Sequence, residues 1–216
     1  MMPGSELEKR MSLRVTDYWK MRELVPETIK KHDPSPSIWL DTGCGTGGVV
    51  RDCLPAFPKT QFVLADPSSD NIQECKRLMN GNERCLYVDR PTDGLNFGDG
   101  SVDAITAILC HHYYPGDGRR KATENCFRML RKNGIYVTFE HVRYESGQED
   151  MDKEWRSKMI SNGLPEEFAD EMLSRRYHEF YPLTEEEFVR HLKDAGFSSV
   201  EVIWKTCSDI GLKAVK

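Results

Sequence analysis

The sequence predicts an α/β fold in which a mostly parallel sheet carries helices on both faces. Two observations support this prediction. Five short apolar runs alternate with segments of helical pattern, and parallel strands need connections of that length. A glycine-rich stretch at 43–48 joins the first apolar run to a helix-like segment, and glycines at such a turn allow the backbone to approach a ligand closely.

The elements are expected in a regular order along the chain. Residues 6–31 carry apolar positions at helical spacing and precede the first strand. Helices are expected at 49–54, at 70–80 and from about 117 to 131, with Asn133-Gly134 as the stop signal of the last one. The five apolar runs are expected as strands at 38–40, 61–65, 85–88, 102–110 and 135–139.

The last third of the chain changes character. Residues 145–183 are charged and helical in pattern. Thr184 and Glu187 form a predicted capping box, which marks the start of another helix that ends near 195–196. Two closing strands are expected, at about 200–204 and 211–215.

Length and composition limit the function classes. The 216 residues are enough for one domain with a real core, and a net charge of −5 disfavours non-specific nucleic-acid binding. No segment looks like a secretion signal or a membrane span. Seven cysteines without a C-x-x-C pair are typical of reduced thiols, so a cytoplasmic protein is expected.

The first apolar run ends in Asp41, and Gly43, Gly45 and Gly47 follow it. This pattern resembles the first motif of the class I S-adenosylmethionine (SAM) methyltransferases. Gly43, Gly45 and Gly48 also satisfy the dinucleotide pattern G-x-G-x-x-G. The methyltransferase resemblance extends over about residues 15–216. It implies a Rossmann-like sheet of seven strands that ends in an antiparallel hairpin, with SAM as cofactor.

The resemblance assigns cofactor contacts to three strand ends. Asp41 would help bind the amino group of SAM, Asp66 the ribose hydroxyls and Asp89 the adenine amino group. Arg90 departs from the family, which often has a small residue there. The predicted cofactor-binding residues are Tyr18, Asp41, Gly43, Cys44, Gly45, Asp66, Pro67, Ser68, Asp89, Arg90 and Cys110.

Residues 110–114, which follow the fourth strand, resemble the Leu-His-His-Leu motif of ubiquinone-biosynthesis-type methyltransferases. The predicted catalytic residues are His111, His112, Tyr113, Glu140 and His141. His111 is expected near SAM and His112 or Tyr113 near the acceptor, while Glu140 and His141 could deprotonate or orient it. A purely structural role for each stays open. No metal site is predicted, because adjacent histidines have poor geometry for one.

The sequence therefore predicts a SAM-dependent methyltransferase for a small-molecule acceptor. The helices at about 6–31 and 145–183 are expected to cover the substrate. The acceptor atom is not determined, and a monomer or a homodimer remains open. A non-catalytic SAM-binding protein or one that processes a modified SAM is the main alternative. An NAD(P)-dependent oxidoreductase is disfavoured by Asp41 and by the lack of a second domain. RNA or protein methylation is disfavoured because 109–114 lack an Asn-Pro-Pro-Tyr motif.

Overall fold

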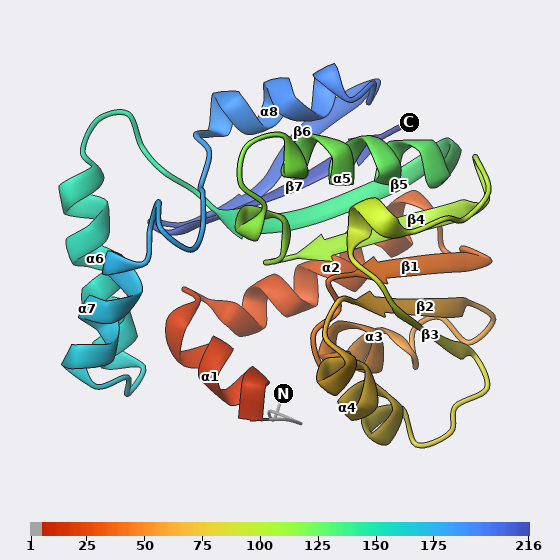
Figure 1. The fold of residues 1–216 in the computed structure, drawn as a ribbon, viewed down its shortest axis with the longest axis horizontal. Helices are drawn as coiled ribbons and strands as arrows, with labels where there is room; N and C mark the ends of the chain where they lie inside the picture. Colours follow the sequence, from red (N-terminus) through yellow and green to blue (C-terminus); the bar gives the residue numbers. More distant parts are fainter. Residues whose placement is uncertain (1–5) are drawn as a thin grey trace.

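A computed structural model describes residues 6–216, and one sheet dominates it. Its strands follow the order β3-β2-β1-β4-β5-β7-β6. The first five strands run parallel, whereas β7 lies antiparallel between β5 and β6 (Figure 1). This sheet confirms the predicted fold class. The strands are β1 (Ile38–Thr42), β2 (Gln61–Asp66), β3 (Cys85–Asp89), β4 (Val102–Ile108), β5 (Leu130–His141), β6 (Ser199–Lys205) and β7 (Asp209–Val215).

The order of the strands reverses between β1 and β4. The chain moves outward from β1 to β3 and then returns to pair β4 with β1. The connection after β1 and the connection after β4 therefore lead away from each other, to opposite sides of the sheet. This opens a crevice at the carboxyl ends of the two strands.

Helices cover both faces of the sheet. Apolar side chains from α2, α3 and α4 pack on one face, where Trp39 and Phe62 are fully buried. Side chains from α5 and α8 pack on the other face, against Leu40 and Ile105. Because successive strand residues point to opposite faces, both faces of β1 are buried. These helices are α2 (Tyr18–His32), α3 (Gly48–Cys53), α4 (Ser69–Met79), α5 (Asp117–Met129) and α8 (Glu185–Asp194).

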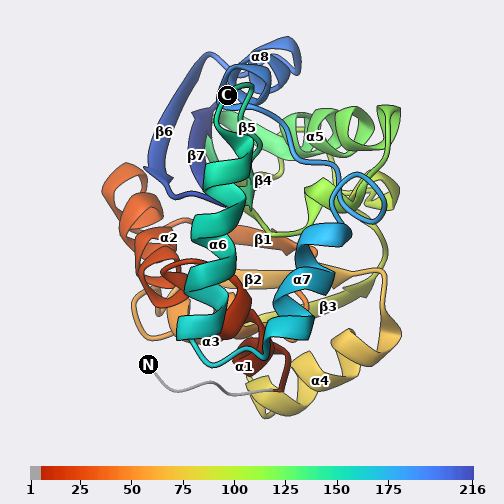
Figure 2. The same cartoon turned by 90° about the vertical axis from the view of Figure 1, so that its left-hand side faces the viewer.

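Three further helices stand at the end of the sheet to which β1 and β4 point (Figure 1). They are α1 (Glu6–Arg14), α6 (Gln148–Ser161) and α7 (Glu166–Ser174). Figure 2 shows α6 and α7 side by side in front of α1. A separate apolar cluster around the fully buried Trp155 joins α6 and α7, so this group of helices has a small core of its own.

The expected helix stop at Asn133-Gly134 is wrong. Helix α5 ends at Met129, and β5 begins directly at Leu130. The pairing of β4 with β5 shifts register there, and Asn133 adopts a φ of 59° in the resulting bulge. A Cβ on Gly134 would come within 2.9 Å of the Asp103 carbonyl oxygen, so the bulge requires glycine.

The predicted capping box of α8 is confirmed. The Thr184 hydroxyl accepts a hydrogen bond from the Glu187 N–H, and the Glu187 carboxylate accepts one from the Thr184 N–H. The fourth strand is shorter than expected, because it ends at Ile108 and a 3₁₀ turn, η2 (His111–Tyr113), follows.

Among the helices that the structure describes, none has the length and hydropathy needed to cross a membrane. Residues 1–5, which were part of the expectation about a secretion signal, lie outside the described residues.

Candidate functional site

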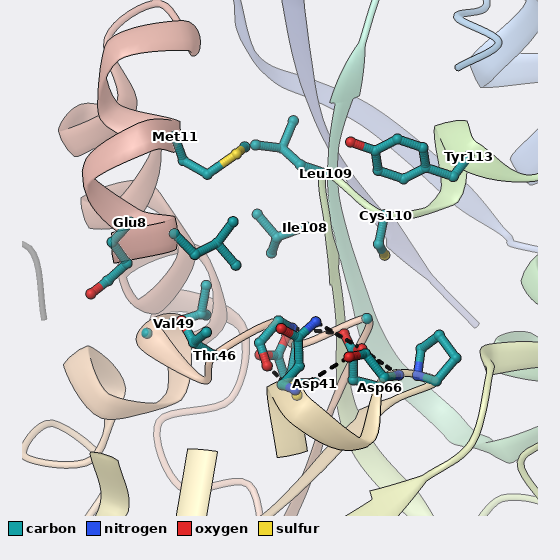
Figure 3. Close-up of a pocket in the computed structure, with 18 of the residues that line it drawn as sticks. Glu8, Met11, Asp41, Thr46, Val49, Asp66, Ile108, Leu109, Cys110 and Tyr113 are labelled. Carbon is teal, nitrogen blue, oxygen red and sulfur yellow. Dashed lines mark hydrogen bonds between the residues drawn. The ribbon is translucent and has the colours of Figure 1, made fainter. Parts of the chain in front are cut away.

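A cavity of about 600 Å³ opens at the carboxyl ends of β1, β2 and β4, beside α1 (Figure 3). Its wall combines the glycine-rich loop with residues from α1, α2 and the turn after β4. The cavity thus occupies the crevice that the reversal of strand order creates. The predicted site residues that line it are Tyr18, Asp41, Gly43, Cys44, Gly45, Asp66, Pro67, Ser68, Cys110 and Tyr113.

Asp66, the last residue of β2, joins the glycine-rich loop to the turn before α4. Its Oδ2 accepts a hydrogen bond from the Gly45 N–H at 2.9 Å. Its Oδ1 accepts from the Ser68 N–H at 2.9 Å and from Asn71 Nδ2 at 3.0 Å. A carboxylate offers about four acceptor positions, so roughly one remains for a hydroxyl of a ligand.

The glycine-rich loop depends on Gly43. Its φ is +63°, a conformation that residues with a side chain rarely adopt. A Cβ at this position would lie 2.4 Å from Cys110 Cβ. Gly43 therefore lets the loop pass close to the turn after β4, where the two segments form adjoining parts of the cavity wall.

Asp41 brings a buried carboxylate to the wall and is 1% exposed. Its Oδ1 accepts a hydrogen bond from Thr106 Oγ1 at 2.6 Å, and Oδ2 has no partner in residues 6–216. Burial raises the pKa of Asp41 to about 7, although the Thr106 hydrogen bond and the charge of Arg22 oppose this shift. The free oxygen suits a cationic hydrogen-bond donor, such as an ammonium group.

A buried ionic network that the sequence analysis missed lies beside α1, and its members Glu8, Tyr18 and Arg22 line the cavity. Arg22 Nη1 donates at 2.8 Å to both Glu8 Oε1 and the Tyr18 hydroxyl, and Nη2 pairs with Asp52. Arg51 also bonds Glu8, at 2.8 and 3.0 Å. Glu8 is the one buried residue of α1. The ion pairs of its carboxylate therefore anchor this helix beside the cavity. The sequence offered only the Tyr18–Arg22 spacing as a signal, because the other partners lie on separate helices.

Comparisons with known proteins agree with this geometry. A family model described as a methyltransferase domain matches residues 40–134, which span the glycine-rich loop, Asp66 and the turn after β4. The chain is also 26% identical over 178 residues to carboxy-S-adenosyl-L-methionine synthase from Staphylococcus epidermidis, which covers 82% of this chain and 77% of that protein. The family model and this relative support a class I SAM-dependent methyltransferase.

Two further proteins, both methyltransferases, are similar to this chain in sequence or in fold. The ubiquinone/menaquinone biosynthesis C-methyltransferase of Campylobacter jejuni is 24% identical over 172 residues, covering 74% of this chain and 70% of that protein. The fold resembles that of Burkholderia thailandensis 1,6-didemethyltoxoflavin-N1-methyltransferase, a structure with bound S-adenosylhomocysteine (SAH). Its TM-score is 0.66 at 16% identity, over all of this chain and 92% of the other. The family model and the SAH-bound structure imply SAM as the cofactor.

Asp89 and Arg90 are placed differently from the other predicted contacts. Both are exposed where β3 ends, and the described wall of the cavity does not include them. Pro91 and Thr92, the next two residues, do line the cavity. An adenine contact by Asp89 stays a prediction, and Thr92 is a wall residue that the sequence analysis missed.

Most of the predicted catalytic residues of this methyltransferase lie behind the wall. Glu140 Oε1 accepts the His111 N–H at 3.0 Å, and Oε2 accepts the His112 N–H at 3.0 Å and His112 Nδ1 at 2.6 Å. All three side chains are at most 2% exposed, and none is among the described wall residues. The Glu140 carboxylate therefore holds the backbone of η2 from the interior side, and these three side chains do not face the cavity.

The protonation of this cluster follows from its burial. Burial lowers the pKa of His111 and of His112 to about 4, so both rings are neutral at pH 7. Burial raises the pKa of Glu140, but the charge of protonated His112 and its hydrogen bond, together with the charges of protonated His111 and of Arg119, lower it further, to about 2. Glu140 is therefore an ionised hydrogen-bond acceptor in the interior.

His141 and Tyr113 have contrasting surroundings. His141 Nδ1 bonds Asp209 Oδ1 at 2.7 Å, and its ring packs against Trp155 and Phe180 in the interior. Tyr113 lines the cavity and is 51% exposed. In Figure 3 its hydroxyl points from η2 toward Leu109 and the cavity. Of the predicted catalytic residues, Tyr113 is therefore the one that lines the cavity.

Asp41→Asn should separate ligand binding from stability. The pKa of Asp41 is raised from 3.8 to about 7, so this group costs stability as the pH rises between those values. The variant should keep or raise the melting temperature at pH 8.5 and bind SAH at least tenfold more weakly in calorimetry. Exposed Asp70→Asn is the control. A lower melting temperature with unchanged SAH affinity would contradict this account of Asp41.

Glu140→Gln should act mainly on folding. Glu140 accepts three hydrogen bonds from His111 and His112, and an amide with one acceptor oxygen leaves at least one buried donor unsatisfied. The cost is about 1–3 kcal/mol, which urea denaturation at pH 7 measures. The loss should persist at pH 5, because the pKa of Glu140 lies at about 2 and its stabilising charge disappears only as the pH falls through that value. Exposed Glu145→Gln should change stability little. Equal stabilities of the two variants would show that Glu140 does not support η2.

Proposed function

We propose that this methyltransferase transfers the methyl group of SAM to a small-molecule acceptor, whose reacting atom is O, N, C or S. The observation that carries the proposal is the division of the cavity into two zones. Asp41, Asp66 and Thr46 stand at one end, whereas Met11 and Leu109 face Tyr113 at the other (Figure 3). The polar end suits an amino acid and a ribose, and the apolar end suits an uncharged molecular body.

The polar end offers the groups that SAM requires. Asp41 Oδ2 would accept from the ammonium of the methionine part, and Asp66 from a ribose hydroxyl. Tyr18, Cys44, Pro67, Ser68 and Cys110 would enclose the cofactor as wall residues. SAM supplies a methyl group already activated on a positively charged sulfur. The residues of this chain therefore act by positioning both reactants and by excluding water.

The acceptor would enter between α1 and η2. Leu7 and Met11 of α1 form one side of the apolar end, and Tyr113 forms another. Helix α6 supports α1 from outside, because Trp155 Nε1 donates to the Arg14 carbonyl oxygen at 2.7 Å. Helices α1 and α2 would thus cover the substrate directly, and the α6–α7 unit would hold that cover in place.

A protein that processes a modified SAM is the second candidate. The resemblance to carboxy-S-adenosyl-L-methionine synthase, which extends over most of both chains, favours it. A small-molecule partner is common to both candidates, and the net charge of −5 disfavours nucleic acid. The seven free cysteines support a cytoplasmic location. A homodimer stays a prediction.

Isotope transfer tests the proposed function. The protein is incubated with SAM that carries a deuterated methyl group, together with the small-molecule, RNA or protein fraction of a cell extract. Mass spectrometry should find the label in the small-molecule fraction. Asp66→Ala should abolish most of the transfer because it removes the anchor of the glycine-rich loop, whereas exposed Asp70→Ala should retain it. Label confined to RNA or protein would contradict the proposal, and a carboxylated SAM would favour the second candidate.

A further inference from the structure

Gly48 begins α3 directly after the glycine-rich loop, and it is the third glycine of the pattern G-x-G-x-x-G. Its φ lies outside the left-handed region that favours glycine, so the backbone conformation does not require this residue. The space around it does. A Cβ on Gly48 would lie 2.2 Å from Glu8 Oε1 and 3.0 Å from Arg22 Nη1. The glycine is therefore needed because the Glu8 carboxylate lies directly against the chain there.

The carboxylate beside Gly48 comes from a distant part of the sequence. Glu8 belongs to α1, and its side chain is only 4% exposed. Glu8, Gly48 and Arg22 all line the cavity. Figure 3 shows Glu8 at the α1 side of the cavity together with Val49, the residue after Gly48. Helix α1 thus brings a negative charge to the point where the glycine-rich loop enters α3.

The same carboxylate binds two arginines at this point. Glu8 Oε1 accepts a hydrogen bond from Arg22 Nη1 at 2.8 Å, and Arg51 donates to both carboxylate oxygens, at 2.8 and 3.0 Å. Asp52 pairs with the same two arginines. Two carboxylates therefore balance two guanidinium groups. Without the charge of Glu8, this network would carry one positive charge in excess beside Gly48.

Open space at a glycine and guanidinium groups next to it are what a phosphate group requires. In a dinucleotide site, the glycines of this pattern let the backbone approach the pyrophosphate closely. Arginines bind phosphate oxygens through paired N–H groups. In this chain the Glu8 carboxylate occupies the space and binds both arginines. A phosphate brought to the same point would also meet a like charge.

We propose that Glu8 is a specificity-determining residue that excludes phosphate-bearing nucleotides from the cavity. Its carboxylate is an anion of the chain itself, and it occupies the position beside Gly48 that a ligand phosphate would need. SAM contains an adenosine but no phosphate, so it does not compete with Glu8 for this position. The inference goes beyond the assignment of SAM, because it names the residue through which a glycine pattern shared with dinucleotide-binding proteins selects against dinucleotides.

Two ligands that differ only in their phosphates, adenosine and ADP, test the inference by calorimetry. The wild type should bind ADP no more tightly than adenosine. Glu8→Gln keeps the side-chain volume and removes the charge, whereas Glu8→Ala also opens the space beside Gly48. Both variants should raise the ratio of ADP affinity to adenosine affinity at least tenfold, and Glu8→Ala should raise it more. Circular dichroism checks that each variant is folded, and Glu8→Gln decides the test if Glu8→Ala is not.

Asp52→Asn is the matched control. It removes the other carboxylate that pairs with Arg22 and Arg51, and Asp52 is not among the described wall residues. This variant should keep the affinity ratio within threefold of the wild type. An unchanged ratio in the Glu8 variants, an equal rise in Asp52→Asn, or a wild type that prefers ADP would each overturn the inference. Failure of the wild type to bind SAH would instead overturn the assignment of the cofactor.

Discussion

The hydrogen bonds of the Asp66 carboxylate are the constraint on which the cavity depends. They join the Gly45 N–H, from the loop after β1, to the Ser68 N–H and the Asn71 amide, from the turn after β2. The glycines allow the loop to bend, and the hydrogen bonds of the Asp66 carboxylate hold the bent loop next to the turn after β2. The same loop leads into α3 and passes close to Cys110.

Buried charges in this protein divide into paired and unpaired groups. The Glu8–Arg22–Arg51–Asp52 network anchors α1, and Glu140 supports η2; in both, oppositely charged or hydrogen-bonding partners offset the cost of burial. The Asp41 carboxylate differs, because its Oδ2 is buried without a partner in residues 6–216 and Asp41 lies in the cavity wall. A ligand group of opposite charge could complete it there. The paired clusters therefore give the cavity its shape, and Asp41 is suited to ligand recognition.

The sequence predicts the fold well because its signals are local. Apolar runs mark the strands, and Asp41 with three glycines marks the cofactor loop, because both patterns lie within a few consecutive residues. Asn133-Gly134 shows the limit: the same pair ends a helix or forms a bulge, and the long-range pairing of β4 with β5 decides between them.

Site residues were harder to predict for a related reason. A strand end places His111 and Glu140 near the crevice, but sequence does not show that they bond each other behind the wall. The importance of Arg22 is hidden because its partners Glu8 and Asp52 come from other helices. A position at a strand end does not by itself bring a side chain to a ligand. The hydrogen bonds and ion pairs that the side chain makes in the folded protein decide whether it is free to do so.

The central claim is that this cavity is a SAM site and not a dinucleotide site. Calorimetric titration of the wild-type protein with SAH, NAD and NADP tests it most directly. The account predicts micromolar binding of SAH with no measurable binding of either dinucleotide. Binding of NAD or NADP without a response to SAH would contradict it, and the glycine-rich loop would then have to be interpreted as a pyrophosphate site.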